Sequence, residues 1–148
     1  MKASRLIFAL LLASSVALVQ LAAQQTKADQ KPIGEVKAKA EAGDAESEVE
    51  LGLRYDKGEG VAKDQVEAAK WFRKAAEQNL AAAQLNLGLS YVKGEGVAED
   101  LVEVYKWVLL AARQGDEGAK KIVTLLENNL RPEQIAQGQK RVREFKPR

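Results

Sequence analysis

The sequence predicts an all-α fold, namely an α/α superhelix (solenoid) of about two full helix-pair repeats with partial repeats at both ends and a C-terminal capping helix. The first observation is a repeat, because residues 43–78 return as residues 79–114 with 19 of 36 positions identical. The second is that apolar residues in each copy recur at steps of three and four, as on one face of a helix. The third is the stretch KGEGV, which divides each copy into two helices. A fixed period of this length indicates stacked supersecondary units.

The N-terminus has the layout of a secretory signal peptide. Lys2 and Arg5 precede a mostly apolar run up to Ala23, after which the sequence turns polar. We therefore expect residues 1–23 to be a signal peptide, with cleavage as late as residue 28, and residues 24–32 to be a linker. The run approaches the ~18 residues of a membrane-spanning helix, so a retained anchor stays open as the alternative. The layout predicts a periplasmic or secreted protein.

The amino-acid composition excludes several classes of site and partner. The chain has no cysteine and no histidine, which excludes a disulfide framework, thiolate chemistry and most transition-metal sites and removes the commonest general base. Its 23 Lys and Arg against 21 Asp and Glu become 21 against 21 once residues 1–23 are removed. With a net charge near zero and one aromatic residue, Phe145, in the basic tail, nucleic acid is not an expected partner.

The first helix of each copy carries a glycine on its apolar face. Gly52 and Gly88 would each cost ~1 kcal/mol relative to Ala inside a helix, so we expect a neighbouring helix or a bulky ring to approach them closely. The apolar positions that recur with them are Ala45, Val49 and Tyr55 in the first copy and Ala81, Leu85 and Tyr91 in the second.

The KGEGV loop is expected to turn the chain rather than to bind a ligand. Gly58 and Gly60, with Gly94 and Gly96 in the second copy, can adopt positive φ without steric cost. A phosphate-binding loop would follow a strand and continue to a further glycine or a Gly-Lys-Ser/Thr. A calcium loop would need alternating oxygen ligands and a closing Glu, which are missing. No cofactor and no metal are expected.

The second helix of each copy has a helix-start signal. Asp64 and Asp100 are each followed three residues later by a glutamate, Glu67 or Glu103, which is a capping-box pattern. Further along these helices, Trp71 and Trp107 are expected to act as wedges between helices.

Partial repeats flank the two full copies, so that residues 33–130 form the repeat region. The segment IGEVKAKAEAG from Ile33 resembles a shortened second half, and a third copy that begins at Gly115 keeps only its first half. Residues 131–148 are expected to form the capping helix and a basic tail, with Pro132 at the helix start. Because Arg131 is a poor N-cap, we expect this helix to fray.

The segment LGLRYDKGEGVAKDQVEAAKWFRKAA, with the 36-residue period, the G-x-G-V loop and the D-x-x-x-x-x-x-W second helix, resembles the Sel1-like repeat, a tetratricopeptide-like family. The resemblance covers about residues 33–148. Asn79 replaces the usual closing glycine, and Asn tolerates the left-handed conformation. The resemblance implies a superhelix of helix pairs that binds other proteins, frequently in bacterial envelopes or in secreted and signalling roles.

Enzyme activity is not expected. The segment Ser90–Lys93 fits the Ser-x-x-Lys of serine acyl-enzymes, and some cysteine-rich relatives of the family have been labelled as lactam-hydrolysing. Lys93 is explained by the repeat, however, and neither Ser-Asp-Asn nor Lys-Thr-Gly appears. An envelope hydrolase of the lactam-hydrolysing type and an anchored structural component of the envelope are the alternatives to a binding role.

The candidate binding surface is a stripe along the first helices. Positions 46, 50 and 54 follow one another at i, i+4 and i+8 and differ between the copies while their neighbours repeat, so we expect this stripe to be free of packing constraints. In a tetratricopeptide-like superhelix the first helices line the concave side, where partners bind. The sequence therefore predicts a non-enzymatic scaffold or adaptor that binds another protein through Glu46, Glu50, Arg54, Asn86 and Ser90. A plain solvent face is the alternative.

Overall fold

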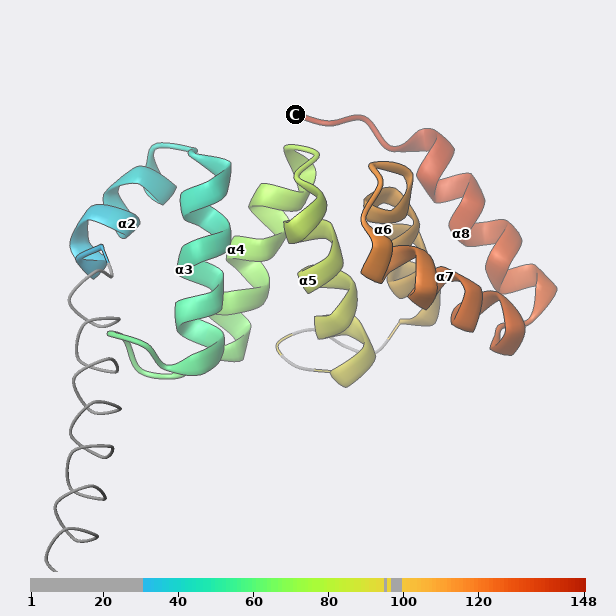
Figure 1. Cartoon of the computed structure of the whole chain (residues 1–148), viewed down its shortest axis with the longest axis horizontal. Coiled ribbons are helices and arrows are strands. Elements are labelled where there is room, and N and C mark those ends of the chain that lie inside the picture. The colour runs from blue at the N-terminus through green and yellow to red at the C-terminus, as the bar shows by residue number, and fades with distance from the viewer. Residues whose placement is uncertain (1–30, 95, 97–99) are drawn as a thin grey trace, which may run out of the picture. The chain divides into compact units, whose positions relative to one another are not determined.

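The computed structural model describes residues 31–94, 96 and 100–148. All regular structure in these residues is helical, which confirms the predicted all-α class. The helices are α2 (Ile33–Glu41), α3 (Ala45–Lys57), α4 (Gln65–Glu77), α5 (Ala81–Lys93), α6 (Leu101–Arg113), α7 (Glu117–Asn129) and α8 (Pro132–Glu144). Residues 33–148 form one unit (Figure 1). The predicted signal peptide and most of the predicted linker lie outside the described residues.

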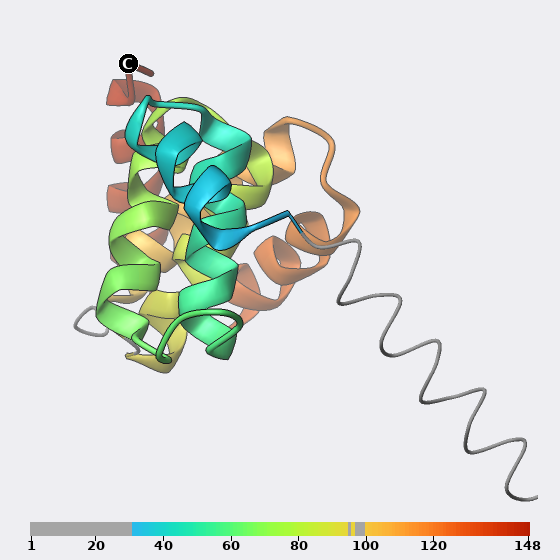
Figure 2. The ribbon, with the colours of Figure 1, turned by 90° about the vertical axis from the view of Figure 1, so that its left-hand side faces the viewer.

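From α2 to α7 each helix packs against the next one in the chain, and α3 with α4 and α5 with α6 form the two helix pairs of the repeat (Figure 1). At one end α2 packs against α3, and at the other α7 packs against α6. The last helix, α8, packs mainly against α6, and Figure 2 shows it on the same side of the stack as α4. The partial repeats thus cover the helix faces that a bare pair would leave in water.

The turns between helices use the residues that the sequence indicated. Gly58 and Gly60 both have φ of 74°, and Gly94 and Gly96 have φ of 66° and 72°. Asn79 also adopts the left-handed conformation, with φ of 65°. The turning role predicted for the KGEGV loop is therefore confirmed for the described glycines.

The aspartates predicted to cap the second helices do so. The Asp64 carboxylate accepts hydrogen bonds from the backbone N–H groups of Val66 and Glu67, both at 3.0 Å. Asp100 caps α6 in the same way. The reciprocal half of the predicted capping box is wrong for Asp64, because its own N–H donates to the Tyr55 carbonyl at 2.9 Å. The Asp64 N–H therefore links the start of α4 to α3, and it does not bond the Glu67 side chain.

Close helix contacts explain the two helical glycines. A Cβ at Gly52 would lie 2.6 Å from Cε1 of Phe72, and one at Gly88 would lie 2.8 Å from Cγ2 of Val108. In each repeat the second helix presses a side chain onto the backbone of the first, as expected.

Both tryptophans are buried, which confirms the predicted wedges: Trp71 is 8% exposed and Trp107 is 2% exposed. Trp71 belongs to a small cluster that it shares with α2, whereas Trp107 belongs to the main core.

The start of α8 holds a cap that sequence reasoning missed. The helix begins at Pro132, as predicted, and the Gln134 side chain accepts a hydrogen bond from the Arg131 N–H at 3.1 Å. This half of a capping box comes from the third residue of the helix rather than from Arg131 itself. The helix was expected to fray because Arg131 is a poor N-cap. The hydrogen bond to Gln134 supplies the missing cap.

Candidate protein-binding surfaces

Two surfaces of the stack carry the charged and polar groups that could contact a partner. The first-helix surface consists of the stripe predicted from the sequence, namely Glu46, Glu50 and Arg54 on α3 with Ala82, Asn86 and Ser90 on α5. The second-helix groove, described below, lies between α4, α6, α8 and the segment that follows α8.

The α3 half of the first-helix surface is not the free stripe that the sequence suggested. Glu46 is exposed, but Arg54 is only 7% exposed and its guanidinium lies 2.6 Å from a carboxylate oxygen of Glu50. A buried charge is retained only where it is paired and hydrogen-bonded. The expectation that this stripe is unconstrained by packing is therefore wrong at Arg54, which holds Glu50 in place.

The α5 half carries neutral groups. Ala82 is exposed, while Asn86 and Ser90 are half-buried. The Ser90 hydroxyl donates to the Asn86 backbone carbonyl at 3.0 Å, an i−4 bond within the helix. This bond engages the hydroxyl of the Ser-x-x-Lys match with its own helix.

A glutamine at the end of each second helix closes its repeat, and sequence reasoning did not single it out. Gln78 donates to the Gly43 carbonyl at 3.1 Å and to the Glu48 carboxylate at 2.9 Å. In the second copy Gln114 donates to Gln84 at 2.9 Å and to the Asn79 side chain at 3.3 Å. We call these contacts the glutamine latch. The signal was available, because the glutamine is identical in both copies.

The latch holds a carboxylate in one copy and an amide in the other. Glu48 is only 3% exposed, and burial raises the pKa of this carboxyl group, with the nearby Asp44 and Glu77 acting in the same direction. The hydrogen bond from Gln78 and the charge of Lys74 oppose the rise. Burial of the Glu48 carboxylate therefore has an electrostatic cost in the first repeat, and the neutral Gln84 side chain has no such cost in the second repeat.

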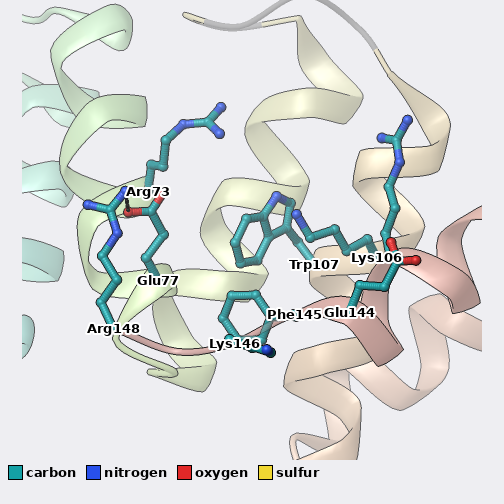
Figure 3. A pocket seen from close by; sticks show the side chains of 9 residues that line it. Arg73, Glu77, Lys106, Trp107, Glu144, Phe145, Lys146 and Arg148 are labelled. Carbon is teal, nitrogen blue, oxygen red and sulfur yellow. Dashed lines mark ion pairs between the residues drawn. The ribbon is translucent and has the colours of Figure 1, made fainter.

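The second-helix groove is a cavity of about 480 Å³ (Figure 3). Its floor is aromatic, because the rings of Trp107 and Phe145 meet edge to face with their centroids 5.5 Å apart. The Lys106 ammonium lies 4.1 Å from the centre of the Trp107 ring. The lining residues are Arg73, Glu77, Lys106, Trp107, Arg141, Glu144, Phe145, Lys146 and Arg148.

The charged walls of the groove are organised by pairs between helices. Arg141 of α8 contacts Glu103 of α6 at 2.6 Å, and Lys106 lies 3.3 Å from the same carboxylate. Arg73 of α4 donates to the Tyr91 hydroxyl of α5 at 2.5 Å. These contacts position cationic groups around an aromatic floor.

The segment Phe145–Arg148 leaves α8 and crosses this face to reach α4. The Arg148 N–H donates to the Glu77 carbonyl at 2.9 Å, and its guanidinium lies 3.2 Å from the Glu77 carboxylate (Figure 3). Beyond Arg148 lies a second cavity of about 400 Å³, which Glu77 and Arg148 line together with residues of α2, α3 and α4 and the turn before α3. The sequence did not reveal this docking, because it joins parts of the chain that are far apart.

No metal site was found in the part of the chain that the structure describes, where no three Asp or Glu side chains come together in a suitable group. The buried indole N–H of Trp107 makes no hydrogen bond with the described residues. Among those residues, no helix has both the length and the apolar character needed to cross a membrane.

Comparison with known proteins gives the context of this geometry. The family described as Sel1 repeat matches residues 45–80 and 81–116. A segment of 41 residues is 46% identical to the secretory immunoglobulin A-binding protein EsiB of Escherichia coli O6:H1 (strain CFT073); it is 28% of this chain and 8% of EsiB.

Two solved structures are similar over 76% of the chain. One is c5321, a protective antigen present in uropathogenic Escherichia coli strains that displays an SLR fold, with 32% identity and a TM-score of 0.73. The other is a Sel1 repeat protein from Oxalobacter formigenes, with 36% identity and a TM-score of 0.63. The chain spans 24% of the first protein and 48% of the second. The chain therefore contains two Sel1 repeats, which are stacked as helix pairs between partial repeats.

Proposed function

We propose that this chain is a non-enzymatic interaction module that is exported to the bacterial envelope or beyond and binds another protein. The observation that carries the proposal is the pair of stacked Sel1 repeats, since proteins built from these repeats are typically interaction scaffolds. A short solenoid presents whole helix faces to a partner, and here those faces carry charged groups that are already oriented.

The relatives support a protein ligand and an extracytoplasmic role. EsiB is named for binding secretory immunoglobulin A, and c5321 is described as a protective antigen. Because the chain spans only a small part of either protein, neither ligand is transferred to it. The N-terminal layout from Lys2 onward supports export.

The first-helix surface is the proposed contact region. Glu46 and Glu50 present carboxylates on α3, with Glu50 held by Arg54, while Asn86 and Ser90 offer neutral polar contacts on α5. Charges at the rim of an interface act mainly on encounter rate and specificity. A partner with a basic patch fits the α3 end of this surface.

The hydrolase alternative has no structural observation in its favour. Ser90 is half-buried in the last turn of α5, and its hydroxyl donates a hydrogen bond to the helix backbone. A serine nucleophile would need its hydroxyl directed to a general base and to an incoming substrate.

Affinity capture of the exported protein, with mass spectrometry of what is retained, tests the proposal. The informative variant combines Glu46→Lys with Ala82→Lys, because both residues are exposed and the helices tolerate lysine. Glu133→Lys on α8 is the matched control. We expect the double variant to lose a partner that the wild type and the control retain, and the interaction to weaken as salt rises.

Retention of every captured protein by the double variant would refute the first-helix surface as the contact region. The intact mass of the exported form tests the leader in the same preparation. A new N-terminus at Gln24 or Asp29 is expected, whereas a full-length chain that pellets with membranes would favour the anchored alternative.

A further inference from the structure

We propose that the second-helix groove is a second binding site, for an extended peptide of a partner protein in which an aromatic residue is followed three positions later by an arginine. The segment Phe145–Arg148 of this chain is the intramolecular occupant of that site. The proposal goes beyond the protein-binding role above, because it concerns the opposite helices of each pair and a defined ligand chemistry.

The way this segment is seated defines the ligand. Phe145 is extended rather than helical, and its ring packs edge to face on Trp107. Three residues later, Arg148 contacts Glu77 twice, through its backbone N–H and through its guanidinium. One aromatic contact, one backbone hydrogen bond and one ion pair are the usual elements of peptide recognition in a groove.

Glu77 is placed where helix stability alone would disfavour it. It is the last residue of α4, and a negative charge at a helix C-terminus opposes the helix dipole. The equivalent residue in the second copy, the last residue of α6, is Arg113, which suits that position. The glutamate at position 77 therefore indicates a role other than stabilising its own helix, and the contact with Arg148 supplies that role.

The hold on the segment is weak enough for exchange. The Arg148 side chain is 79% exposed, and ion pairs of exposed groups contribute little. Its advantage over a free peptide is that it is tethered, which corresponds to an effective concentration on the order of millimolar. A longer partner peptide would gain further contacts in the two cavities, about 480 and 400 Å³, that Glu77 and Arg148 both line.

The test uses a fluorescently labelled peptide with the sequence of residues 143–148, REFKPR, and fluorescence anisotropy with the full chain. Phe145→Ala with Arg148→Ala removes the intramolecular contacts of the segment and leaves the residues that α4, α6 and α8 contribute to the groove unchanged. We expect this variant to bind the peptide at least 10-fold more tightly than the wild type does. Adding Glu77→Arg, which installs the residue of the second copy, should reverse that gain.

Two controls make the outcome specific. Lys146→Ala lies in the same segment but removes neither anchor, so it should bind the peptide no better than the wild type. A peptide with glutamate in place of the final arginine should not bind. Arg148→Ala alone changes an exposed side chain and leaves the fold intact, and we expect it to bind the peptide about 3-fold more tightly than the wild type does. This single variant serves as the test if the double variant unfolds.

Equal binding by the wild type and the released variants would overturn the proposal. So would the absence of peptide binding to a released variant that melts cooperatively, because the segment would then serve only to stabilise the end of the stack. A gain that survives Glu77→Arg would also overturn it, since the arginine pocket would not be the site of recognition.

Discussion

The two repeats share 19 of 36 residues, yet their equivalent tryptophans join them to different neighbours. Trp71 packs with Val36 and Ala40 of α2, at the first end of the stack. Trp107 packs with Phe145, beyond α8, at the other end. Identical residues thus build the helix pair, while the residues around them fit each pair to its own end.

A second pair of equivalent residues shows the same difference between the copies. Ala69 of the first copy corresponds to Tyr105 of the second, whose hydroxyl donates to Glu127 of α7 at 2.6 Å. Burial raises the pKa of Tyr105, and the bond to Glu127 acts in the same direction. A Cβ at Gly138 of α8 would lie 2.5 Å from this tyrosine ring. The second repeat therefore carries a residue specialised for its contact with the terminal helices.

The largest effect is expected from Trp107→Ala. Replacing a buried Trp by Ala typically costs ~3–5 kcal/mol, against a total stability of ~5–15 kcal/mol for a domain. Urea unfolding should show this loss, and Trp71→Ala should lose less because its cluster is smaller. Trp107→Phe should cost less still, since the indole N–H has no partner among the described residues. A loss below about 1 kcal/mol for Trp107→Ala would mean that this side chain does not hold the end of the stack.

Substitutions at the helical glycines should cost about 1–3 kcal/mol, because overpacking outweighs the gain in helix propensity. Gly52→Ala should be the more harmful, since its Cβ would lie 2.6, 2.7 and 3.2 Å from three atoms of the buried Phe72 ring, whereas the Cβ of Gly88→Ala meets one methyl group of Val108 at 2.8 Å. Gly34→Ala in α2 is the matched control, since a Cβ there meets nothing within 4 Å. Thermal melts should show the control unchanged or stabilised, and equal losses at all three positions would refute the packing explanation.

Exchanging the residues of the glutamine latch should change stability by on the order of 1 kcal/mol. Glu48→Gln should stabilise the protein at neutral pH, because it gives the first repeat the neutral latch of the second. In the folded state the raised pKa of Glu48 means that the carboxyl binds its proton more tightly than in the unfolded chain. Its effect on stability therefore becomes less favourable as pH rises from the ordinary Glu range through the raised pKa.

Urea melts across that pH range measure the effect. The variant should lose this part of the pH dependence, and Gln84→Glu should introduce it in the second copy. A wild type and a Glu48→Gln variant with parallel pH profiles would show that burial of the carboxyl has no energetic consequence.

The smallest effect is expected from Glu46→Lys. The residue is exposed at the start of α3, and such substitutions usually stay within ~0.5 kcal/mol, although a lysine near a helix N-terminus is slightly unfavourable. Its melting temperature should therefore match the wild type. A clear loss would show that the first-helix surface is part of the fold rather than available to a partner.

The predictions that succeeded rest on local patterns. The caps at Asp64 and Asp100 and the positive-φ glycines are each set by a few neighbouring residues, and the 36-residue period follows from comparing the two copies directly. Arg54 was misjudged because an i, i+4 stripe does not say how far a neighbouring helix covers it. The glutamine latch and the docking of Arg148 on Glu77 were missed because they join residues from different helices. The signal for the latch was the identity of Gln78 and Gln114, and the signal for the docking was the difference between Glu77 and its equivalent Arg113.

Hydrogen exchange, read by mass spectrometry on two full-chain variants, tests most directly whether the equivalent tryptophans hold two separate ends. Ile33→Ala removes a side chain that packs in the Trp71 cluster, and Phe145→Ala removes the ring that packs on Trp107. We expect Ile33→Ala to raise exchange in α2 only, and Phe145→Ala to raise it in α8 and the segment after it only. If either variant raised exchange equally at both ends, the two repeats would not act as separate anchors and the comparison would be wrong.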